Sequence, residues 1–332
     1  MNRLFALILL LPAAAFGQQW PLLDEAPGAE HTVATWSIIA RDPATGQIGI
    51  AVQSRAFRAG RTVPYAEPGV GLVATQAGAA NTNYGKKAMA WLREGMAPQA
   101  IVDRLVKEDP TPGGRQVAVI DNQGRIAVYT GPTCGVWAGH KIGDQFSSQG
   151  NILTGPQVVE ETFKAFQAAK GDFADRLLTA LEAGQKVGGD ARGMQAGAVW
   201  VIEPQPDPNG SERYRGVDIR VDDAEDPFKE LRRILNIVYS GRESQLSTRL
   251  ADEKKFKEAI EAQKKAIELN PKGDQLVYTL AQRYAQAGDT ANALATLRRA
   301  ITLHSRWKEA ARTQANFDGI KNHPDFVKLV NQ

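Results

Sequence analysis

The last third of the chain repeats its own pattern at a spacing of 34 residues, and this repeat constrains the fold more than any other feature. Ala259 recurs as Ala293 and Ala266 as Ala300, and apolar residues around them recur at the same spacing. A period of 34 residues is typical of a unit of two helices, and Gly288-Asp289 supplies the turn inside the complete unit. Because each unit buries its apolar face only against a neighbour, the sequence predicts an all-α array of helical hairpins.

This repeat resembles the tetratricopeptide pattern, with Leu280, Ala281 and Tyr284 at the first-helix positions. We expect tetratricopeptide-type helical repeats and a capping helix over residues 241–332, where the pattern is lost after Trp307. The resemblance implies a protein partner that docks on this part of the chain. Two hairpins are few for such an array, so we also expect packing against the rest of the chain or self-association as a homo-oligomer.

The N-terminal end has the pattern of a signal peptide. A basic residue precedes an apolar run over residues 4–16, and small residues stand before a cut at Gln18. The run is short for a membrane span, so we expect an exported protein, periplasmic or extracellular, with no integral membrane segment after processing. A retained anchor is the alternative. Residues 1–17 are then the signal peptide, and residues 18–30 a linker or pro-segment.

Composition and spacing favour neither nucleic acid, nor a metal, nor another cofactor. The net charge is only +3, and the four histidines have no metal-site spacing. Asp222, Asp223 and Asp226 are oxygen ligands of the kind that hard cations prefer, but capping of a helix by Asp226 is favoured. Cys134 is the single cysteine. It would need His140 as a base to act as a nucleophile, and a buried structural role is favoured.

Strand and helix patterns alternate in the part of the chain before the repeat. Period-2 runs and turn residues predict strands at 35–42, 46–55, 69–78, 116–120, 125–131, 195–202 and 214–221. Helical spacing predicts helices at 83–94, from 98 onwards, and at 156–168, 172–185 and 227–239. A chain of this order can bury paired sheets between helical layers, so the fold class is α+β.

Six motifs occur in order in this region: TWSIIARDPATGQIGIAVQSR, VPYAEPGVGLVATQA, TGPTCGVWAGH, QGNILTGPQVV, AGQKVGGDARGMQ and DIRVDDAEDP. Together, over residues 33–240, they resemble the domain of unknown function 1028 family, which is placed in the Ntn-hydrolase superfamily. The resemblance implies a four-layer αββα sandwich, Ntn-hydrolase-like, for residues 31–240. A shared fold does not by itself establish an activity.

Ntn hydrolases use an N-terminal Thr, Ser or Cys whose own α-amine is the base for the side-chain nucleophile. The resemblance places Thr35 at the nucleophile position, with Ser37 as a second candidate on the same strand face. An ordinary strand role for Thr35 is the alternative. Signal cleavage would leave Gln18 as the terminus, so a further cut between Ala34 and Thr35 is required.

Other polar residues are predicted to surround this position. Arg55 has a guanidinium that could orient an anionic substrate group or form a salt bridge at a strand end. Gln149 and Asn151 flank a glycine in a predicted turn, which could line an oxyanion hole or satisfy its own backbone. Candidate binding residues are Gln53, Thr75, Gln76, Asn81, Asp190 and Arg192.

The sequence departs from proteasome-like relatives at two of their functional positions. Gln53 stands where these relatives carry an Asp, and Glu67 lies in a stretch that lacks their Lys. Two functions follow as hypotheses. One is amide-bond hydrolysis in peptides or cell-wall-derived compounds, and the other is a noncatalytic ligand-binding domain with a tetratricopeptide module that docks a partner. The ligand in either case is a small molecule or peptide.

Overall fold

The structure is a computed structural model that describes residues 35–78, 80–205 and 215–331. The predicted signal peptide at 1–17 and the predicted linker at 18–30 lie outside these residues. Within the described ranges, none of the helices combines the length and the apolar character that crossing a membrane requires.

Two antiparallel sheets form the centre of the first part of the chain. The larger contains β1 (Trp36–Arg41), β2 (Ile48–Ser54), β7 (Ala138–Gly143), β8 (Phe146–Asn151), β9 (Ala196–Ile202) and β10 (Arg215–Val221), in the order β10-β9-β2-β1-β8-β7. The smaller contains β3 (Pro64–Glu67), β4 (Gly71–Gln76), β5 (Gln116–Asp121) and β6 (Ile126–Thr130), in that order. β1 is thus a central strand, paired with β2 on one side and β8 on the other.

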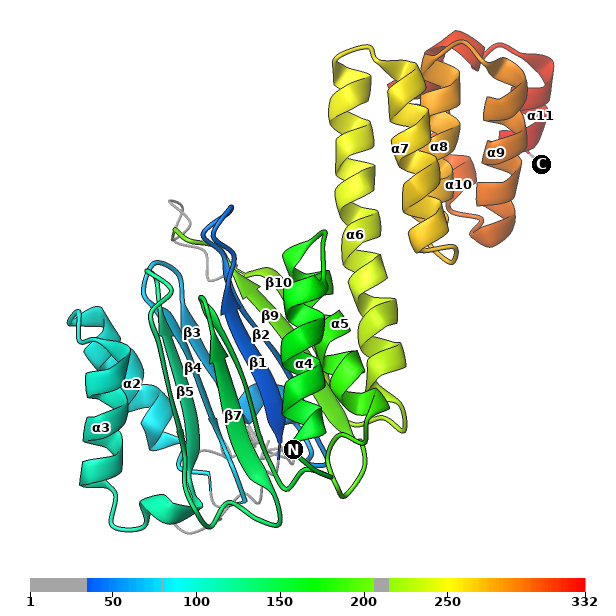
Figure 1. Cartoon of the computed structure of the whole chain (residues 1–332). Helices are drawn as coiled ribbons and strands as arrows, with labels where there is room; N and C mark the ends of the chain where they lie inside the picture. The colour runs from blue at the N-terminus through cyan, green and yellow to red at the C-terminus, as the bar shows by residue number, and fades with distance from the viewer. Residues whose placement is uncertain (1–34, 79, 206–214, 332) are drawn as a thin grey trace, which may run out of the picture. The chain divides into compact units, whose positions relative to one another are not determined.

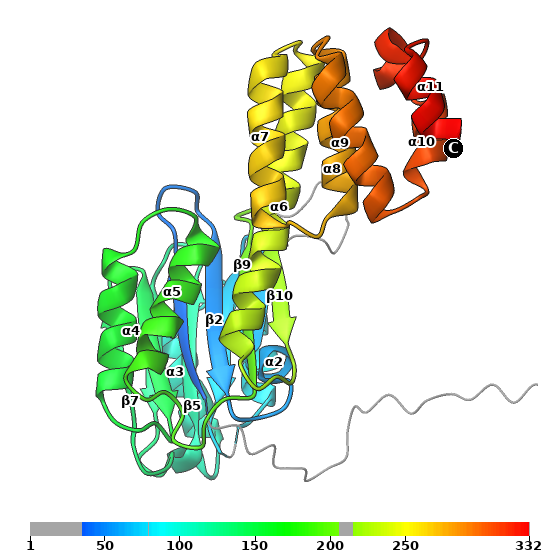
Figure 2. The ribbon, with the colours of Figure 1, turned by 90° about the vertical axis from the view of Figure 1, so that its right-hand side faces the viewer.

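Helices cover the outer face of each sheet. α2 (Asn83–Arg93) and α3 (Pro98–Glu108) pack on the smaller sheet, whereas α4 (Gln157–Ala168) and α5 (Phe173–Lys186) pack on the larger one (Figure 1). Figure 2 shows α4 and α5 side by side over the larger sheet. The short α1 (Ala59–Thr62) and η1 (Pro112–Gly114) lie in connections.

The alternation of residues along β1 explains how its two faces are used. Trp36 and Ile38 belong to the apolar cluster beneath α4 and α5, whereas Ile39 belongs to the cluster between the two sheets. Successive side chains of a strand point to opposite faces, so an apolar run buried on both faces is what a central strand between two layers requires. By the same alternation, Ser37 lies on the face toward the smaller sheet, where it bonds Gln76 of β4.

α6 (Pro227–Asp252) connects the sheets to the helical array. It begins with Pro227 at its first position, and Asp226 Oδ1 accepts a hydrogen bond from the Lys229 main-chain N–H at 3.0 Å. The predicted capping role of Asp226 is therefore confirmed. The helix contacts β9 and β10 as well as α7 and α8.

The C-terminal region is helical throughout most of its length. It contains α7 (Phe256–Leu269), α8 (Asp274–Gln286), α9 (Thr290–Leu303), α10 (Trp307–Thr313), η2 (Ala315–Ile320) and α11 (Pro324–Asn331). α7 and α9 have the same length of 14 residues and begin 34 residues apart, as the repeat in the sequence predicts. Tyr278 of α8 stacks on Trp307 with ring centroids 4.2 Å apart, in the core of this region.

The structure differs from the sequence predictions in three respects. The turn predicted at Gln149–Asn151 is the end of β8, because the run FSSQGN is polar but fully buried and so lacks the apolar alternation that marks a strand. β3, β7 and α1 were not predicted for the same lack of a periodic signal. The helix predicted to end near Tyr239 continues to Asp252, so the domain boundary predicted at 240 falls inside α6.

Leu231 is the residue through which α6 packs most closely on the larger sheet. It is fully buried, and a Cβ atom added to Gly197 of β9 would lie 2.9 Å from Leu231 Cδ1. Leu231→Ala should lower the free energy of unfolding by about 3 kcal/mol, measured by urea denaturation. Ile237→Ala on the same helix, where the side chain is 39% exposed, should cost less than about 1 kcal/mol. Equal losses would contradict this packing.

Candidate functional site

Three hydrogen bonds converge on the main-chain carbonyl of Thr35, at the head of β1. The donors are the Asn151 main-chain N–H at 3.0 Å, Asn151 Nδ2 at 3.2 Å and Gln76 Nε2 at 3.3 Å. Because a carbonyl oxygen only accepts, these contacts fix the orientation of both side-chain amides. Thr35 is thereby held between the end of β8 in the larger sheet and the end of β4 in the smaller one.

Gln116, the first residue of β5, joins this group to the strands beside it. Its Oε1 accepts from Gln76 Nε2 and Asn151 Nδ2, both at 2.9 Å. Its Nε2 donates to the carbonyls of Gly139 at 3.1 Å and Gly150 at 2.9 Å. The side chain is buried and its direction is fixed at both ends, so it acts as a rigid bridge between the sheets.

Ser37 is engaged on both sides by the same network. Its hydroxyl donates to Gln76 Oε1 at 2.8 Å and accepts from Gln149 Nε2 at 2.8 Å. Gln149 Oε1 in turn accepts from the Ser147 hydroxyl at 2.8 Å. The Ser37 proton and a lone pair are therefore committed to neighbouring amides.

The side chain of Thr35 differs from that of Ser37. Thr35 is fully buried, and its Oγ1 has no hydrogen-bond partner among the residues that the structure describes. A buried hydroxyl without a partner costs about 1–3 kcal/mol. Asn151 Oδ1 and Gln53 Oε1 nearby are also buried without a partner among the described residues. Unpaired buried groups gathered in this way mark the head of β1 as the candidate reactive position.

Backbone strain occurs on both sides of this position. Ala77 follows Gln76 with a φ of 141°, and Ile152 follows Asn151 with a φ of 52°. A positive φ is rare outside glycine, and for a β-branched residue it is a genuine outlier. Strained residues persist only where their surroundings hold them, and they cluster at functional sites. Here they flank the two amides that bind the Thr35 carbonyl.

Four predicted site residues form a second group around Asp190. The Asp190 carboxylate accepts from the Arg55 main-chain N–H at 3.0 Å and pairs with the Arg192 guanidinium at 2.7 Å. Arg55 Nη1 donates to the Arg192 carbonyl at 3.3 Å, and Gln53 Nε2 contacts the Gly193 carbonyl at 3.5 Å. Gln53 pairs with Trp36 in the sheet, so this group lies beside the head of β1.

The remaining predicted residues, Thr75 and Asn81, belong to a third group around Asp109. Thr75 Oγ1 donates to the Asn81 carbonyl, and Asn81 Nδ2 contacts Asp109 Oδ2 at 3.4 Å. Burial by itself raises the pKa of the Asp109 carboxyl. Hydrogen bonds from Arg115 and from the Thr111 main-chain N–H outweigh this effect and hold that pKa well below its usual range. This group fixes the start of α2 and the end of α3.

Cys134 is buried, as predicted, and its sulfur lies 3.1 Å from the Arg115 carbonyl oxygen. Burial raises the pKa of this thiol. His140 does not contact it and instead shares a 2.9 Å hydrogen bond with Thr130. Within the described ranges, no group of three His, Cys, Asp or Glu residues is placed to hold a metal.

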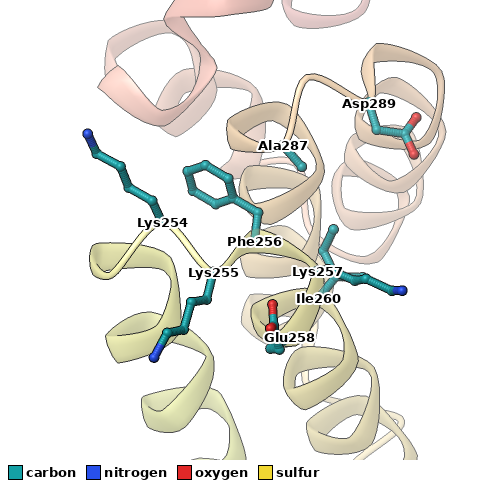
Figure 3. Close-up of a pocket in the computed structure, with 8 residues that line it drawn as sticks. All are labelled: Lys254, Lys255, Phe256, Lys257, Glu258, Ile260, Ala287 and Asp289. Carbon is teal, nitrogen blue, oxygen red and sulfur yellow. The ribbon is translucent and has the colours of Figure 1, made fainter.

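A cavity of about 600 Å³ lies in the helical array, at the turns before α7 and before α9. Figure 3 shows Phe256 and Ala287 toward the space between these turns. The ammonium groups of Lys254, Lys255 and Lys257 point in different directions. Because they diverge, these lysines do not form a single site for an anion.

Sequence reasoning found most of the residues at the head of β1 but missed three that organise them. Gln116, Ala77 and Ile152 were not predicted, although a glutamine at the start of an otherwise apolar strand is a signal of a buried polar contact. A positive φ at a residue other than glycine cannot be recognised from the sequence. The predicted residues fall into three adjoining groups rather than one cleft.

Asp109 provides a test of the third group. At pH 7, Asp109→Asn should lower the free energy of unfolding by about 2–3 kcal/mol, because the charged hydrogen bond to Arg115 is lost. The folded pKa lies below the unfolded value of 3.8, so the stabilisation is present above about pH 4 and is lost as the pH falls further. Urea denaturation at pH 7 and pH 3 measures this. Glu108→Gln is the exposed control and should have a much smaller effect; a pH-independent loss would contradict the account.

Comparison with known proteins agrees with the first part of the fold. The model of a family of unknown function, DUF1028, matches residues 35–231. The crystal structure of protein SPO2555 from Silicibacter pomeroyi, itself described as DUF1028, is similar at 30% identity with a TM-score of 0.55. The match covers 61% of this chain and 84% of that one. No curated protein matches. The chain belongs to the DUF1028 family.

Proposed function

We propose that the chain is an exported amidohydrolase of the Ntn type, with Thr35 as its nucleophile. The observation that carries this proposal is the fully buried Thr35 hydroxyl, which has no partner among the described residues and lies next to a carbonyl held by three donors. A reactive hydroxyl must be placed accurately and yet remain uncommitted, and Thr35 meets both conditions. The family match also begins at this residue.

The hydrogen-bond directions favour Thr35 over Ser37. The Ser37 hydroxyl donates to Gln76 and accepts from Gln149, so an attack by its oxygen would first require both bonds to break. Thr35 Oγ1 has no such bonds among the described residues. We therefore propose that Ser37 positions the amides and does not react.

The Thr35 α-amine would serve as the base once the Ala34–Thr35 bond is cut. A terminal amine has a pKa of about 7.7–8.0. The partners of the Thr35 carbonyl are uncharged amides, and burial favours the neutral amine. This environment supplies a base at neutral pH without the Asp and Lys that are replaced in this sequence.

The proposed reaction proceeds in two steps. Thr35 Oγ1 attacks the acyl carbon of an amide, its proton passes to the α-amine, and the leaving nitrogen takes that proton as the C–N bond breaks. Water then attacks the resulting ester, gives its hydroxyl to the acyl group and returns a proton to Thr35 Oγ1. Asn151 and Gln76 hold the Thr35 carbonyl throughout, so we propose both as positioning residues. For Asn151 this role replaces the predicted one of oxyanion donor.

The layered arrangement supports this assignment. Two facing antiparallel sheets lie between α2–α3 and α4–α5, and the proposed nucleophile opens a central strand of the larger sheet. We propose that this arrangement is the αββα sandwich of the Ntn hydrolases. Peptides and cell-wall-derived compounds remain the proposed substrate classes, and the signal-peptide pattern of residues 1–17 supports export.

We propose a second function for the helical array, the docking of a protein partner through tetratricopeptide-type repeats. The 34-residue offset between α7 and α9 supports it. Phe256, which is only partly buried beside Ala287 in the cavity described above, is a candidate contact. In the alternative without catalysis, this array would be joined to a ligand-binding domain.

The proposal predicts the N-terminus of the exported protein. Secreted with its own leader, the wild-type chain should begin at Thr35, as measured by intact mass and N-terminal sequencing. Thr35→Ala should remain uncut at this bond and lose at least about a thousandfold in amide hydrolysis, because both nucleophile and cut are absent. Thr35→Ser should retain cutting.

Ser37→Ala is the matched control, since it removes a hydroxyl from the same strand and face. It should still yield a chain that begins at Thr35. A wild-type chain that is continuous through residue 35, or a Thr35→Ala chain cut at the same bond, would refute the mechanism.

A further inference from the structure

A second cavity, of about 520 Å³, lies where the chain crosses from β6 of the smaller sheet to β7 of the larger one. It is lined by residues 130–132 and 134–140, and we call it the β6–β7 cavity. Val136 at this cavity is 93% exposed.

The wall of this cavity is bonded to the network that holds Thr35. Gln116 Nε2 donates to Thr130 Oγ1 at 2.9 Å and to the Gly139 carbonyl at 3.1 Å, and both residues line the cavity. The other end of Gln116 bonds Asn151, which bonds the Thr35 carbonyl. One glutamine side chain therefore separates the cavity wall from the amide at the head of β1.

The sheet register gives the distance between the β6–β7 cavity and the head of β1. Ala138 of β7 pairs with Asn151 of β8, and Trp36 of β1 pairs with Gly150 of β8. β7 is thus two strands from β1, about 10 Å at the usual strand spacing. An acyl chain of a few carbons that ends in a ring spans this distance.

The strained residue beside Asn151 supports the rim of the cavity. A Cβ atom added to Gly135 would lie 2.4 Å from Ile152 Cγ1, so the loop rests directly on this side chain. Gly135 itself has a φ of 115°, which other residues rarely adopt. Ile152 therefore supports the cavity rim at Gly135. It also directly follows Asn151, whose amide binds the Thr35 carbonyl.

The described residues that line the cavity include no Lys, Arg, Asp or Glu. Burial lowers the pKa of His140, so its ring is neutral at pH 7. Thr130 Oγ1 shares a 2.9 Å hydrogen bond with His140 Nδ1. Trp137 and Val136 add an aromatic and an apolar surface. Such a lining fits an uncharged group, with Trp137 and Val136 as its apolar side, and disfavours an ion.

We propose that the β6–β7 cavity is the subsite for the acyl part of the substrate, and that it selects amides whose acyl chain ends in an uncharged aromatic or branched apolar group. This inference rests on the proposed function. The acyl part stays bound through both steps of the reaction, whereas the leaving amine must depart before water enters. A cavity beside the head of β1 therefore serves the acyl side.

The test compares two 4-nitroanilides, one of acetic acid and one of 4-phenylbutyric acid. For the exported wild-type protein, kcat/KM should be at least tenfold higher for the 4-phenylbutyryl substrate. Ala138→Phe fills the cavity and should bring the ratio of the two values to within about twofold. Ile142→Phe lies on the same strand outside the cavity and should leave the ratio unchanged. If Ala138→Phe does not fold, the exposed Val136→Asp places a charge at the rim and should lower the ratio at least threefold.

A binding measurement separates this inference from the proposed function. Uncharged 4-phenylbutyramide should bind the full-length Thr35→Ala chain and change its tryptophan fluorescence, and adding Trp137→Phe or Ala138→Phe should remove the change. If the amide binds in this way but the exported wild-type protein hydrolyses neither anilide, the proposed function is refuted and the proposed apolar binding site is supported. Hydrolysis of both anilides at similar kcat/KM, or binding that Ala138→Phe does not reduce, would overturn the subsite.

Discussion

The carbonyl oxygen of Thr35 is the point on which the polar centre of the structure depends. Three donors bind it, and because a carbonyl cannot donate, it sets the direction of Gln76 and Asn151. Those two amides then set Gln116, and Gln76 sets the Ser37 hydroxyl. Each bond contributes only about 0.5–1.5 kcal/mol, but a reversed amide would leave buried groups unpaired at about 1–3 kcal/mol each. The bonds to the Thr35 carbonyl therefore disfavour a reversed Gln76 or Asn151 amide.

An amide network between two sheets has consequences for chemistry as well as for stability. Apolar packing in the same space would be simpler, and the rest of the layer is apolar, with Ile39, Ile50 and Ile120 fully buried. Buried side-chain amides of this part of the chain gather at the end where β1 begins. Since none of the amides is charged, they can hold a nucleophile without fixing its protonation state. This is the property that the proposed mechanism requires, because one residue supplies both the nucleophile and its base.

Much of the fold could be predicted from the sequence because most elements follow the usual periodicities. Turn residues and apolar spacing predict the Asp226 cap, the hairpin of β5 and β6, and the 34-residue offset of α7 and α9. β8 could not be predicted, because its buried residues are polar and its partners lie in strands far along the chain. Family resemblance identified Thr35, yet its distinction from Ser37 depends on hydrogen bonds across the sheets. The role of Gln116 and the strain at Ile152 likewise exist only in three dimensions.

The central claim is that Thr35 alone, of the hydroxyls at the head of β1, is chemically competent. A β-lactone acylates a reactive hydroxyl and leaves a stable ester, which peptide mapping by mass spectrometry locates to one residue. After incubation of the exported protein with such a lactone, the account predicts a single adduct on a peptide whose first residue is Thr35, with its oxygen as the acylated atom. An adduct on Ser37 or Cys134, or no adduct on a properly folded chain, would contradict it.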